Sequence, residues 1–235
     1  MKLNIPSDGT KIGHDGERLV VPDNPIIPYI IGDGIGIDVT PVMKRVLDYA
    51  VNKAYGNTRE IKWLELYAGS NSKELYGSIL PEETIEAMKE YRISIKGPLT
   101  TPIGKGHKSI NVQIRQKLDL FACVRPIKYF PGTSTPMAES GLTDMVVFRE
   151  NTEDLYSGIE WEPNSPGAKR IIEFINKELG HSPFRFEDNC GIGIKPVSEE
   201  GTKRLIRMAI DYSLALNKSS ITIVHKGNIM KFTEG

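Results

Sequence analysis

Short apolar runs alternate with stretches of helical spacing along most of this 235-residue chain. The first apolar run, Ile26 to Ile30, predicts a strand. The next segment predicts a helix that Thr40 caps, with Pro41 in its first turn and an end at Gly56. The first 24 residues are polar and rich in Gly, Pro and Asp, and they predict an arm or a loose edge hairpin.

The alternation continues as far as residue 148. Strands are predicted at 61–67, 93–96 and 145–148, and a helix that Pro81 opens is predicted to run to about residue 91. Strands that alternate with helices of this length favour an α/β fold with a mainly parallel sheet. Ligand sites in such sheets gather beyond the carboxyl ends of the strands, so the residues that follow each strand are candidates for function.

The pattern changes at about residues 154–190, where a loop and a helix over 171–179 indicate an excursion from the sheet. Regular alternation then returns. It predicts a strand at 192–194, a helix capped by Ser198 and a strand at 221–224.

The charge balance limits the partners to consider. Thirty Lys and Arg residues balance thirty Asp and Glu residues, so no global field draws the chain to nucleic acid or to an anionic membrane. Any anion must therefore be recognised by a local group of cations. The two cysteines, Cys123 and Cys190, lie outside any CxxC pattern, which argues against a disulfide framework or a zinc site and suits a reducing compartment. The start of the chain is no secretory signal, and the most apolar stretch is too short to span a bilayer, so we expect a cytoplasmic protein.

The segment from Lys96 to Arg115 is the richest in candidate chemistry. Its Gly, Pro and Thr residues predict a loop that leads into a helix near Ser109. A helix amino terminus favours a carboxylate or phosphate, and Asn111 and Arg115 share one helix face because they are four residues apart. The three side chains therefore predict a carboxylate-binding socket. The alternative is that Ser109 only caps the helix and that Arg115 is solvated.

Arg125 and Arg149 lie at the ends of predicted strands. An arginine there can hold a carboxylate through two parallel hydrogen bonds, which lysine cannot. Either residue could instead be an ordinary surface ion-pair partner. Together with Arg115, the two predict a small ligand that carries several negative charges.

Three further features carry weaker signals. The turn at 32–36 has the pattern G-x-G-x-G rather than the dinucleotide-binding G-x-G-x-x-G, which favours a tight structural turn. Tyr156 and Lys226 are candidate acid–base groups, and the alternative for each is a purely structural role. The four histidines are scattered without metal-ligand spacing, so we expect no histidine metal site.

Several long strings, in order along almost the whole chain, carry a resemblance to a known family. They lie at residues 25–36, 96–115, 118–126, 148–160, 191–196 and 225–228. In these strings the chain resembles the bacterial NADP-type isocitrate dehydrogenases, within the larger family of β-decarboxylating hydroxyacid dehydrogenases. The resemblance implies that family's α/β fold together with a clasp-like excursion that pairs two subunits.

The resemblance also implies roles for individual residues. Five match isocitrate-binding positions, namely Ser109, Asn111, Arg115, Arg125 and Arg149. Thr100 and Asn228 match positions beside the nicotinamide cofactor. Tyr156 matches the residue that protonates the enol carbon after carbon dioxide leaves, and Lys226 matches a lysine that assists deprotonation of the 2-hydroxyl in the partner subunit's site. Ser109 also matches a serine that some bacterial members phosphorylate, and a phosphate there would place about two negative charges where a substrate carboxylate binds.

The implied reaction is the oxidative decarboxylation of isocitrate to 2-oxoglutarate with reduction of NADP, a step of the tricarboxylic acid cycle that requires Mg²⁺ or Mn²⁺. The resemblance places the metal ligands and the remaining cofactor-binding residues beyond residue 235. A new helix is also predicted to begin at 231–235, so we expect the natural chain to continue and the truncated chain to be inactive alone.

The resemblance further implies a domain division. Residues 1–120 are expected to be the first part of a large α/β domain, residues 121–153 and 199–235 part of a small α/β domain, and residues 154–198 a clasp that forms a homodimer. Two alternatives stay open. One is a related substrate, isopropylmalate or homoisocitrate, although the polar Ser109 and Asn111 favour isocitrate over a substrate with an alkyl substituent. The other is a non-catalytic half-protein that binds carboxylates or pairs with a full-length subunit.

Overall fold

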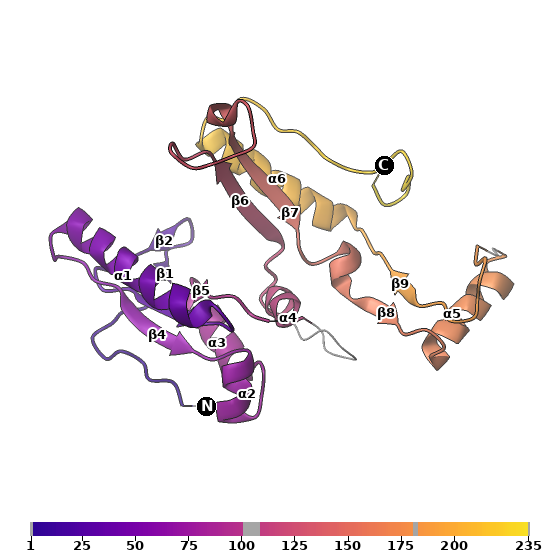
Figure 1. Cartoon of the computed structure of the whole chain (residues 1–235), viewed down its shortest axis with the longest axis horizontal. Helices are drawn as coiled ribbons and strands as arrows, with labels where there is room; N and C mark the ends of the chain where they lie inside the picture. The colour runs from indigo at the N-terminus through magenta and orange to yellow at the C-terminus, as the bar shows by residue number, and fades with distance from the viewer. Residues whose placement is uncertain (1, 101–108, 181–182, 235) are drawn as a thin grey trace. The chain divides into compact units, whose positions relative to one another are not determined.

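A computed structural model describes residues 2–100, 109–180 and 183–234 (Figure 1). The chain divides into two compact units, residues 1–118 and residues 119–235. Each unit is described by itself below. In the described ranges, no helix combines the length and the apolar character needed to cross a membrane.

The first unit is built on a three-stranded parallel sheet with the order β4-β3-β5. Strand β3 (Ile26–Ile30) lies in the centre, and all five of its residues are buried. Strands β4 (Lys62–Leu66) and β5 (Ile95–Lys96) flank it in parallel register. The predicted strand at 26–30 and the α/β fold class are therefore confirmed, whereas β5 covers only the end of the strand predicted at 93–96.

Helix α1 (Gly36–Tyr55) begins earlier than the sequence predicted. Thr40 does not cap the helix, because its side chain is buried and its hydroxyl donates a hydrogen bond to the Ile31 carbonyl at 2.7 Å. Pro41 accordingly lies inside the helix rather than in a first turn that follows Thr40. The predicted end is correct, since Gly56 adopts the left-handed conformation with φ of 56° that ends many helices.

The remaining elements of the first unit surround the sheet. Strands β1 (Gly13–His14) and β2 (Leu19–Val20) form the expected amino-terminal hairpin. Helix α3 (Glu82–Tyr91) follows Pro81 as predicted, and it buries Tyr91 in the core at 1 % exposure. Helix α2 (Ser70–Tyr76) was not predicted, and helix α4 (Ile110–Lys117) begins directly after Ser109, as predicted.

The second unit contains an antiparallel pair of long strands, β6 (Ala122–Lys128) and β7 (Asp144–Glu150). The short 3-10 helix η1 (Ser140–Leu142) precedes β7. Helix α6 (Glu199–Ala215) packs on the sheet, where the rings of Phe148 and Tyr212 meet edge to face at 5.3 Å. Ser198 caps α6 as predicted, because its hydroxyl accepts a hydrogen bond from the Gly201 N–H.

Between β7 and α6 the chain forms the 3-10 helix η2 (Asp154–Ser157) and a second antiparallel pair, β8 (Ile159–Trp161) and β9 (Ile192–Ile194). Helix α5 (Pro166–Lys177) connects the two strands. The predicted strand at 192–194 is confirmed.

The strand predicted at 221–224 is wrong. This segment pairs with no strand among the described residues. Its apolar side chains instead line a hollow beside β7 and α6.

Candidate functional site

The socket residues of the first unit lie at the start of helix α4. Ser109 occupies the position before the first turn, and Asn111 and Arg115 follow one helical turn apart. All three are partly exposed. The Asn111 side-chain amide donates a hydrogen bond to the Leu99 carbonyl at 3.3 Å. This hydrogen bond connects the amino-terminal turn of α4 to the 97–100 segment, so residues of both can contribute to one ligand-binding site.

Lys96 adds a second cation to this group, and the sequence analysis did not single it out. Desolvation lowers the pKa of the Lys96 ammonium group and the positive charge of Arg115 lowers it further, while Asp33 opposes both effects. The ammonium group also donates a hydrogen bond to the Gly97 carbonyl at 2.8 Å. The positive charges of Lys96 and Arg115 can together attract a carboxylate.

Asp33 also fixes the 97–100 segment. Its carboxylate accepts hydrogen bonds from the N–H groups of Ser70 at 2.8 Å and Thr100 at 2.9 Å. Its own N–H donates to the Pro98 carbonyl at 2.6 Å. Gly69 must lack a side chain, because a Cβ there would lie 2.6 Å from the Asp33 carboxylate oxygens. The 32–36 turn is therefore a structural turn that holds Thr100, and its carboxylate would repel a phosphate.

Arg149 is the next-to-last residue of β7, close to the predicted strand end, whereas Arg125 lies in the middle of β6, because the two strands pair over seven residues each. Cys123 is the direct partner of Arg149, and Arg125 is two residues further along the same strand. Side chains on one face alternate along a strand, so the two arginines share a face as diagonal neighbours, about 7–8 Å apart. Phe148, which contacts α6, points to the other face.

Within the described ranges, the guanidinium groups of Arg125 and Arg149 form no ion pair with a carboxylate, although Arg125 donates a hydrogen bond to the Cys123 sulfur at 3.2 Å. This observation disfavours the alternative that they are ordinary surface ion-pair partners. Two unpaired cations on one sheet face can bind a ligand with several carboxylates.

Tyr156 lies against Arg149. The guanidinium carbon of Arg149 is 4.4 Å from the centre of the Tyr156 ring, a distance at which a cation and an aromatic ring attract each other. Both side chains are partly buried. The structure thus brings together one predicted ligand-binding residue and one predicted acid–base residue.

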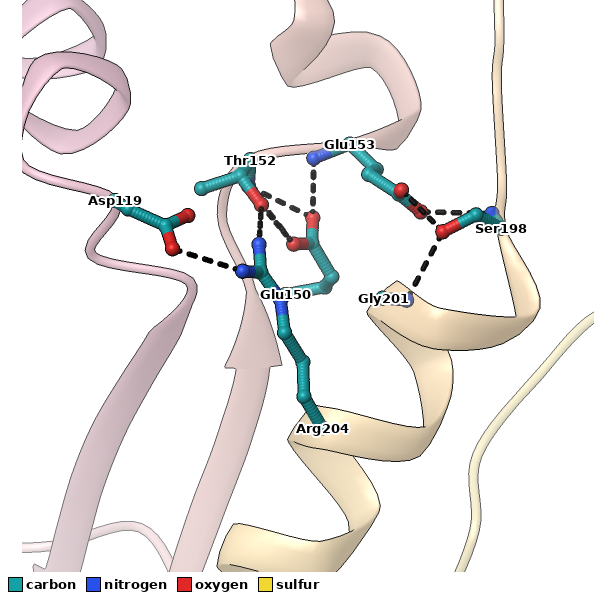
Figure 2. Close-up of polar contacts among 7 residues, drawn as sticks. All are labelled: Asp119, Glu150, Thr152, Glu153, Ser198, Gly201 and Arg204. Atoms are coloured by element: carbon teal, nitrogen blue, oxygen red, sulfur yellow. Dashed lines mark hydrogen bonds and ion pairs between the residues drawn. The ribbon is translucent and has the colours of Figure 1, made fainter.

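The turn that separates these two residues is held by a polar network (Figure 2). The Glu150 carboxylate accepts hydrogen bonds from the N–H groups of Thr152 and Glu153. Arg204, from helix α6, donates to the Thr152 hydroxyl at 2.9 Å and pairs with Asp119 at 2.9 Å. Sequence reasoning missed this network, since its members are up to 85 residues apart in the chain.

Lys226 and Asn228 lie in the irregular segment after residue 220, and both are exposed. The Lys226 N–H donates to the Glu234 carboxylate at 2.5 Å. Lys195 connects this segment to η2, because its ammonium group contacts both Glu234 and Asp154. The hydrogen bond to Glu234 raises the pKa of Lys195 above its usual value.

The described residues do not fit a metal site. Among them, no three His, Cys, Asp or Glu side chains are grouped so that they could hold a metal ion. Two of the four histidines, 107 and 181, lie outside the described residues.

Comparison with known proteins gives consistent matches. Residues 26–235 match the family model described as isocitrate/isopropylmalate dehydrogenase. The chain is 57% identical over its whole length to isocitrate dehydrogenase (NADP) 1 of Colwellia maris and covers 57% of that protein. It is 53% identical to isocitrate dehydrogenase (NADP) of Pseudomonas aeruginosa, with the same coverage of both chains.

A solved structure with the same fold is the isocitrate dehydrogenase from Methylococcus capsulatus. The TM-score is 0.70 at 34% identity, over 89% of this chain and 53% of that one. The chain thus spans somewhat more than half the length of the curated relatives it matches.

Proposed function

The chain belongs to the isocitrate/isopropylmalate dehydrogenase family, and we propose that it serves the NADP-dependent oxidative decarboxylation of isocitrate to 2-oxoglutarate, a step of the tricarboxylic acid cycle. The observation that carries this proposal is the similarity over the whole chain to relatives named NADP isocitrate dehydrogenase. The grouping of cations in a chain without net charge supports it, because isocitrate carries three carboxylates.

Each unit contributes part of the proposed substrate-binding set. In the first unit, Ser109 and Asn111 at the start of α4 would hydrogen-bond one carboxylate of the substrate. Arg115 would form an ion pair with the same carboxylate. In the second unit, Arg125 and Arg149 would bind further carboxylates through paired hydrogen bonds from one sheet face. Isopropylmalate is the less favoured substrate, since its alkyl group would gain nothing from the polar side chains on α4.

The proposed acid–base roles belong to Tyr156 and Lys226. The Tyr156 hydroxyl would return a proton to the substrate carbon after carbon dioxide leaves, with its ring oriented by Arg149. Lys226 would assist removal of the proton from the 2-hydroxyl. Thr100 and Asn228 would lie beside the nicotinamide ring, and the chemistry that bound NADP supplies is acceptance of a hydride from the substrate. No three of the described His, Cys, Asp or Glu side chains are grouped so that they could hold the Mg²⁺ or Mn²⁺ ion of this reaction.

The proposal includes an assembly, a modification and a location. The segment from β8 to β9 would pair two copies in a homodimer, in which Lys226 acts in the partner subunit's site. Apolar side chains on this segment are exposed, including Phe174 at 53% and Phe186 at 73%. Phosphorylation of Ser109 would block carboxylate binding through charge repulsion. The free cysteines Cys123 and Cys190 suit the reducing cytoplasm.

Isothermal titration calorimetry with isocitrate tests the proposal. We expect isocitrate to bind more tightly than 3-isopropylmalate, and Arg149→Met to weaken binding by about tenfold or more, the loss of one charge-assisted interaction. The matched control is Arg207→Met, which removes an exposed arginine of α6 and should leave binding unchanged. Tighter binding of isopropylmalate would overturn the substrate assignment.

A turnover assay separates catalysis from binding. Formation of NADPH from isocitrate and NADP in the presence of Mg²⁺ would support the proposed reaction in this chain. Isocitrate binding without turnover is expected if this chain is inactive alone, and it fits both the proposed function and the non-catalytic alternative, in which the chain only binds carboxylates or pairs with a longer subunit. Absence of isocitrate binding would reject the proposed function and leave subunit pairing as the alternative.

A further inference from the structure

The Arg149–Tyr156 contact depends on the geometry of the chain between the two residues. Arg149 is the next-to-last residue of β7, and Tyr156 lies in η2. Only six residues separate them, and their side chains stack at 4.4 Å. Any change in the turn over residues 150–153 therefore moves the ring relative to the guanidinium group.

The turn is closed by hydrogen bonds from its own side chains. The Glu150 carboxylate accepts from the Thr152 N–H at 2.9 Å, the Thr152 hydroxyl at 2.7 Å and the Glu153 N–H at 2.8 Å. Asn151 within the turn is buried at 3% exposure, and its N–H donates to the Phe121 carbonyl at 3.1 Å. These hydrogen bonds restrict the conformation of the turn.

Helix α6 contacts this turn at two points on successive helical turns (Figure 2). At the first point, the Glu153 carboxylate accepts a hydrogen bond from the Ser198 N–H at 2.8 Å. Gly201 permits this approach, because a Cβ there would lie 2.6 Å from a Glu153 carboxylate oxygen. At the second point Arg204, which follows Gly201 by three residues, donates to the Thr152 hydroxyl.

Arg204 also ties the turn to the start of β6. Its other terminal nitrogen pairs with Asp119 at 2.9 Å, and its guanidinium carbon lies 4.5 Å from the centre of the Phe121 ring. The Thr152 hydroxyl accepts from Arg204 and donates to Glu150, so the three groups form a chain of mutually polarised hydrogen bonds. A planar guanidinium can make these contacts at once, whereas a lysine ammonium cannot.

We propose that Arg204 is a positioning residue for substrate binding, which acts through Thr152 to hold the Arg149–Tyr156 pair in its stacked arrangement. This inference rests on the proposed function for the identity of the ligand. The Asp119 carboxylate neutralises the charge of Arg204, and the guanidinium group lies against the Phe121 ring. Its effect on the ligand is therefore conformational rather than a direct charge interaction.

The test uses Arg204→Met and Thr152→Val, alone and combined, with two readouts. One is the isocitrate Kd. The other is the fluorine resonance of Tyr156 after incorporation of 3-fluorotyrosine, identified by its loss in Tyr156→Phe. The matched control is Lys218→Met, which breaks an ion pair to Asp144 at 3.0 Å at the opposite end of β7. This control shows how far the loss of any one ion pair in the second unit changes the two readouts.

We expect Arg204→Met to shift the Tyr156 resonance and to raise the isocitrate Kd about tenfold, the equivalent of one lost charge-assisted hydrogen bond. Thr152→Val should also raise the Kd. The double variant should bind isocitrate as tightly as Arg204→Met does, because both substitutions break the same chain of hydrogen bonds. Arg204→Lys should not restore binding. Lys218→Met should leave both readouts unchanged.

The outcomes separate this inference from the proposed function. If Arg204→Met alters neither readout, or raises the Kd while the Tyr156 resonance stays in place, the positioning role is wrong. If the unmodified chain fails to bind isocitrate while Arg204→Met still shifts the resonance, the proposed substrate is wrong and the positioning of the Arg149–Tyr156 pair stands. Should Arg204→Met fail to fold, Thr152→Val provides the test, since it removes only one hydroxyl group.

Discussion

Replacement of Asp33 by alanine tests how the first unit holds the segment that carries Thr100. Asp33 as a residue is 9% exposed, and its carboxylate accepts hydrogen bonds from the N–H groups of Ser70 and Thr100. In Asp33→Ala both N–H groups lose their acceptor. The change therefore removes the link between the 32–36 turn, the start of α2 and the 97–100 segment.

The expected cost follows from the two donors. A partly buried N–H left without a partner costs about 1–3 kcal/mol, so two such groups give about 2–6 kcal/mol. Water can enter the space that the carboxylate leaves, which favours the lower half of this range, about 2–4 kcal/mol. Since whole domains are stable by only about 5–15 kcal/mol, this is a large share of the stability of the first unit.

Urea unfolding followed by tryptophan fluorescence measures this cost. The chain has two tryptophans. Trp63 belongs to the first unit, where it donates a hydrogen bond to Asp48 at 2.8 Å. Work in a Trp161→Phe background makes Trp63 the sole reporter, so that the unfolding of the first unit is observed by itself. A separate reporter is needed because a chain with two units need not unfold in one step.

Two companion variants sharpen the result. Asp33→Asn keeps the volume and one acceptor oxygen but points an N–H₂ group at a backbone N–H, so its free energy of unfolding should be intermediate. Asp23→Ala removes an exposed ion pair with Arg59 and should change the stability by less than about 1 kcal/mol. If Asp33→Ala is no less stable than Asp23→Ala, the carboxylate does not hold this segment, and the assignment of the 32–36 turn is wrong.

Three further predictions concern other residues. Gly97→Ala should destabilise the first unit by at least about 1–3 kcal/mol in the same urea assay, because its Cβ would lie 1.9 Å from the Ile31 carbonyl oxygen, whereas Gly13→Ala, whose Cβ has only ordinary contacts, should not. Burial, followed by the charge of a neighbouring carboxylate, raises the pKa of Tyr29 to about 12. Because this value exceeds the ordinary tyrosine pKa of 10.0, the contribution of Tyr29 to stability should be complete below about pH 10 and should be lost between about pH 10 and 12. If the thermal unfolding of Tyr29→Phe depends on pH in the same way as that of the unsubstituted protein, this prediction is wrong. Ser109→Asp should abolish isocitrate binding in calorimetry while Ser109→Ala weakens it only a few-fold, and equal effects of the two would exclude charge repulsion as the cause.

Local sequence signals predicted those elements whose ends are set by local interactions. Ile26–Ile30 is a strand because all five residues are buried, and Gly56 ends α1 because it adopts a left-handed conformation. Ser198 caps α6 through a residue three positions away. The start of α1 was missed because Thr40 bonds to the carbonyl of Ile31, outside the helix, instead of capping it. The choice between these partners is a tertiary one, which residue spacing does not encode.

The candidate site divides in the same way. Asn111 and Arg115 were found because helical spacing alone puts them on one face. Lys96 was missed, since the charges that act on it, those of Arg115 and Asp33, lie on other elements. Arg204 was missed because its partners precede it by 52 and 85 residues. Its position in α6, one turn after Gly201, has a meaning only once the 150–153 turn is placed against that helix.

The partners of each arginine separate those that stabilise the fold from those that can bind a ligand. Arg204 pairs with Asp119, and its charge is spent on the fold. Arg149 contacts an aromatic ring and, within the described ranges, no carboxylate, so its charge stays available. A chain without net charge binds a polyanion where some of its cations are not paired with Asp or Glu carboxylates. Glu150, next to Arg149, is held away from it by the hydrogen bonds of the Thr152 and Glu153 N–H groups. The turn thereby keeps the nearest carboxylate occupied, and a change that frees Glu150 would weaken anion binding even if Arg149 did not move.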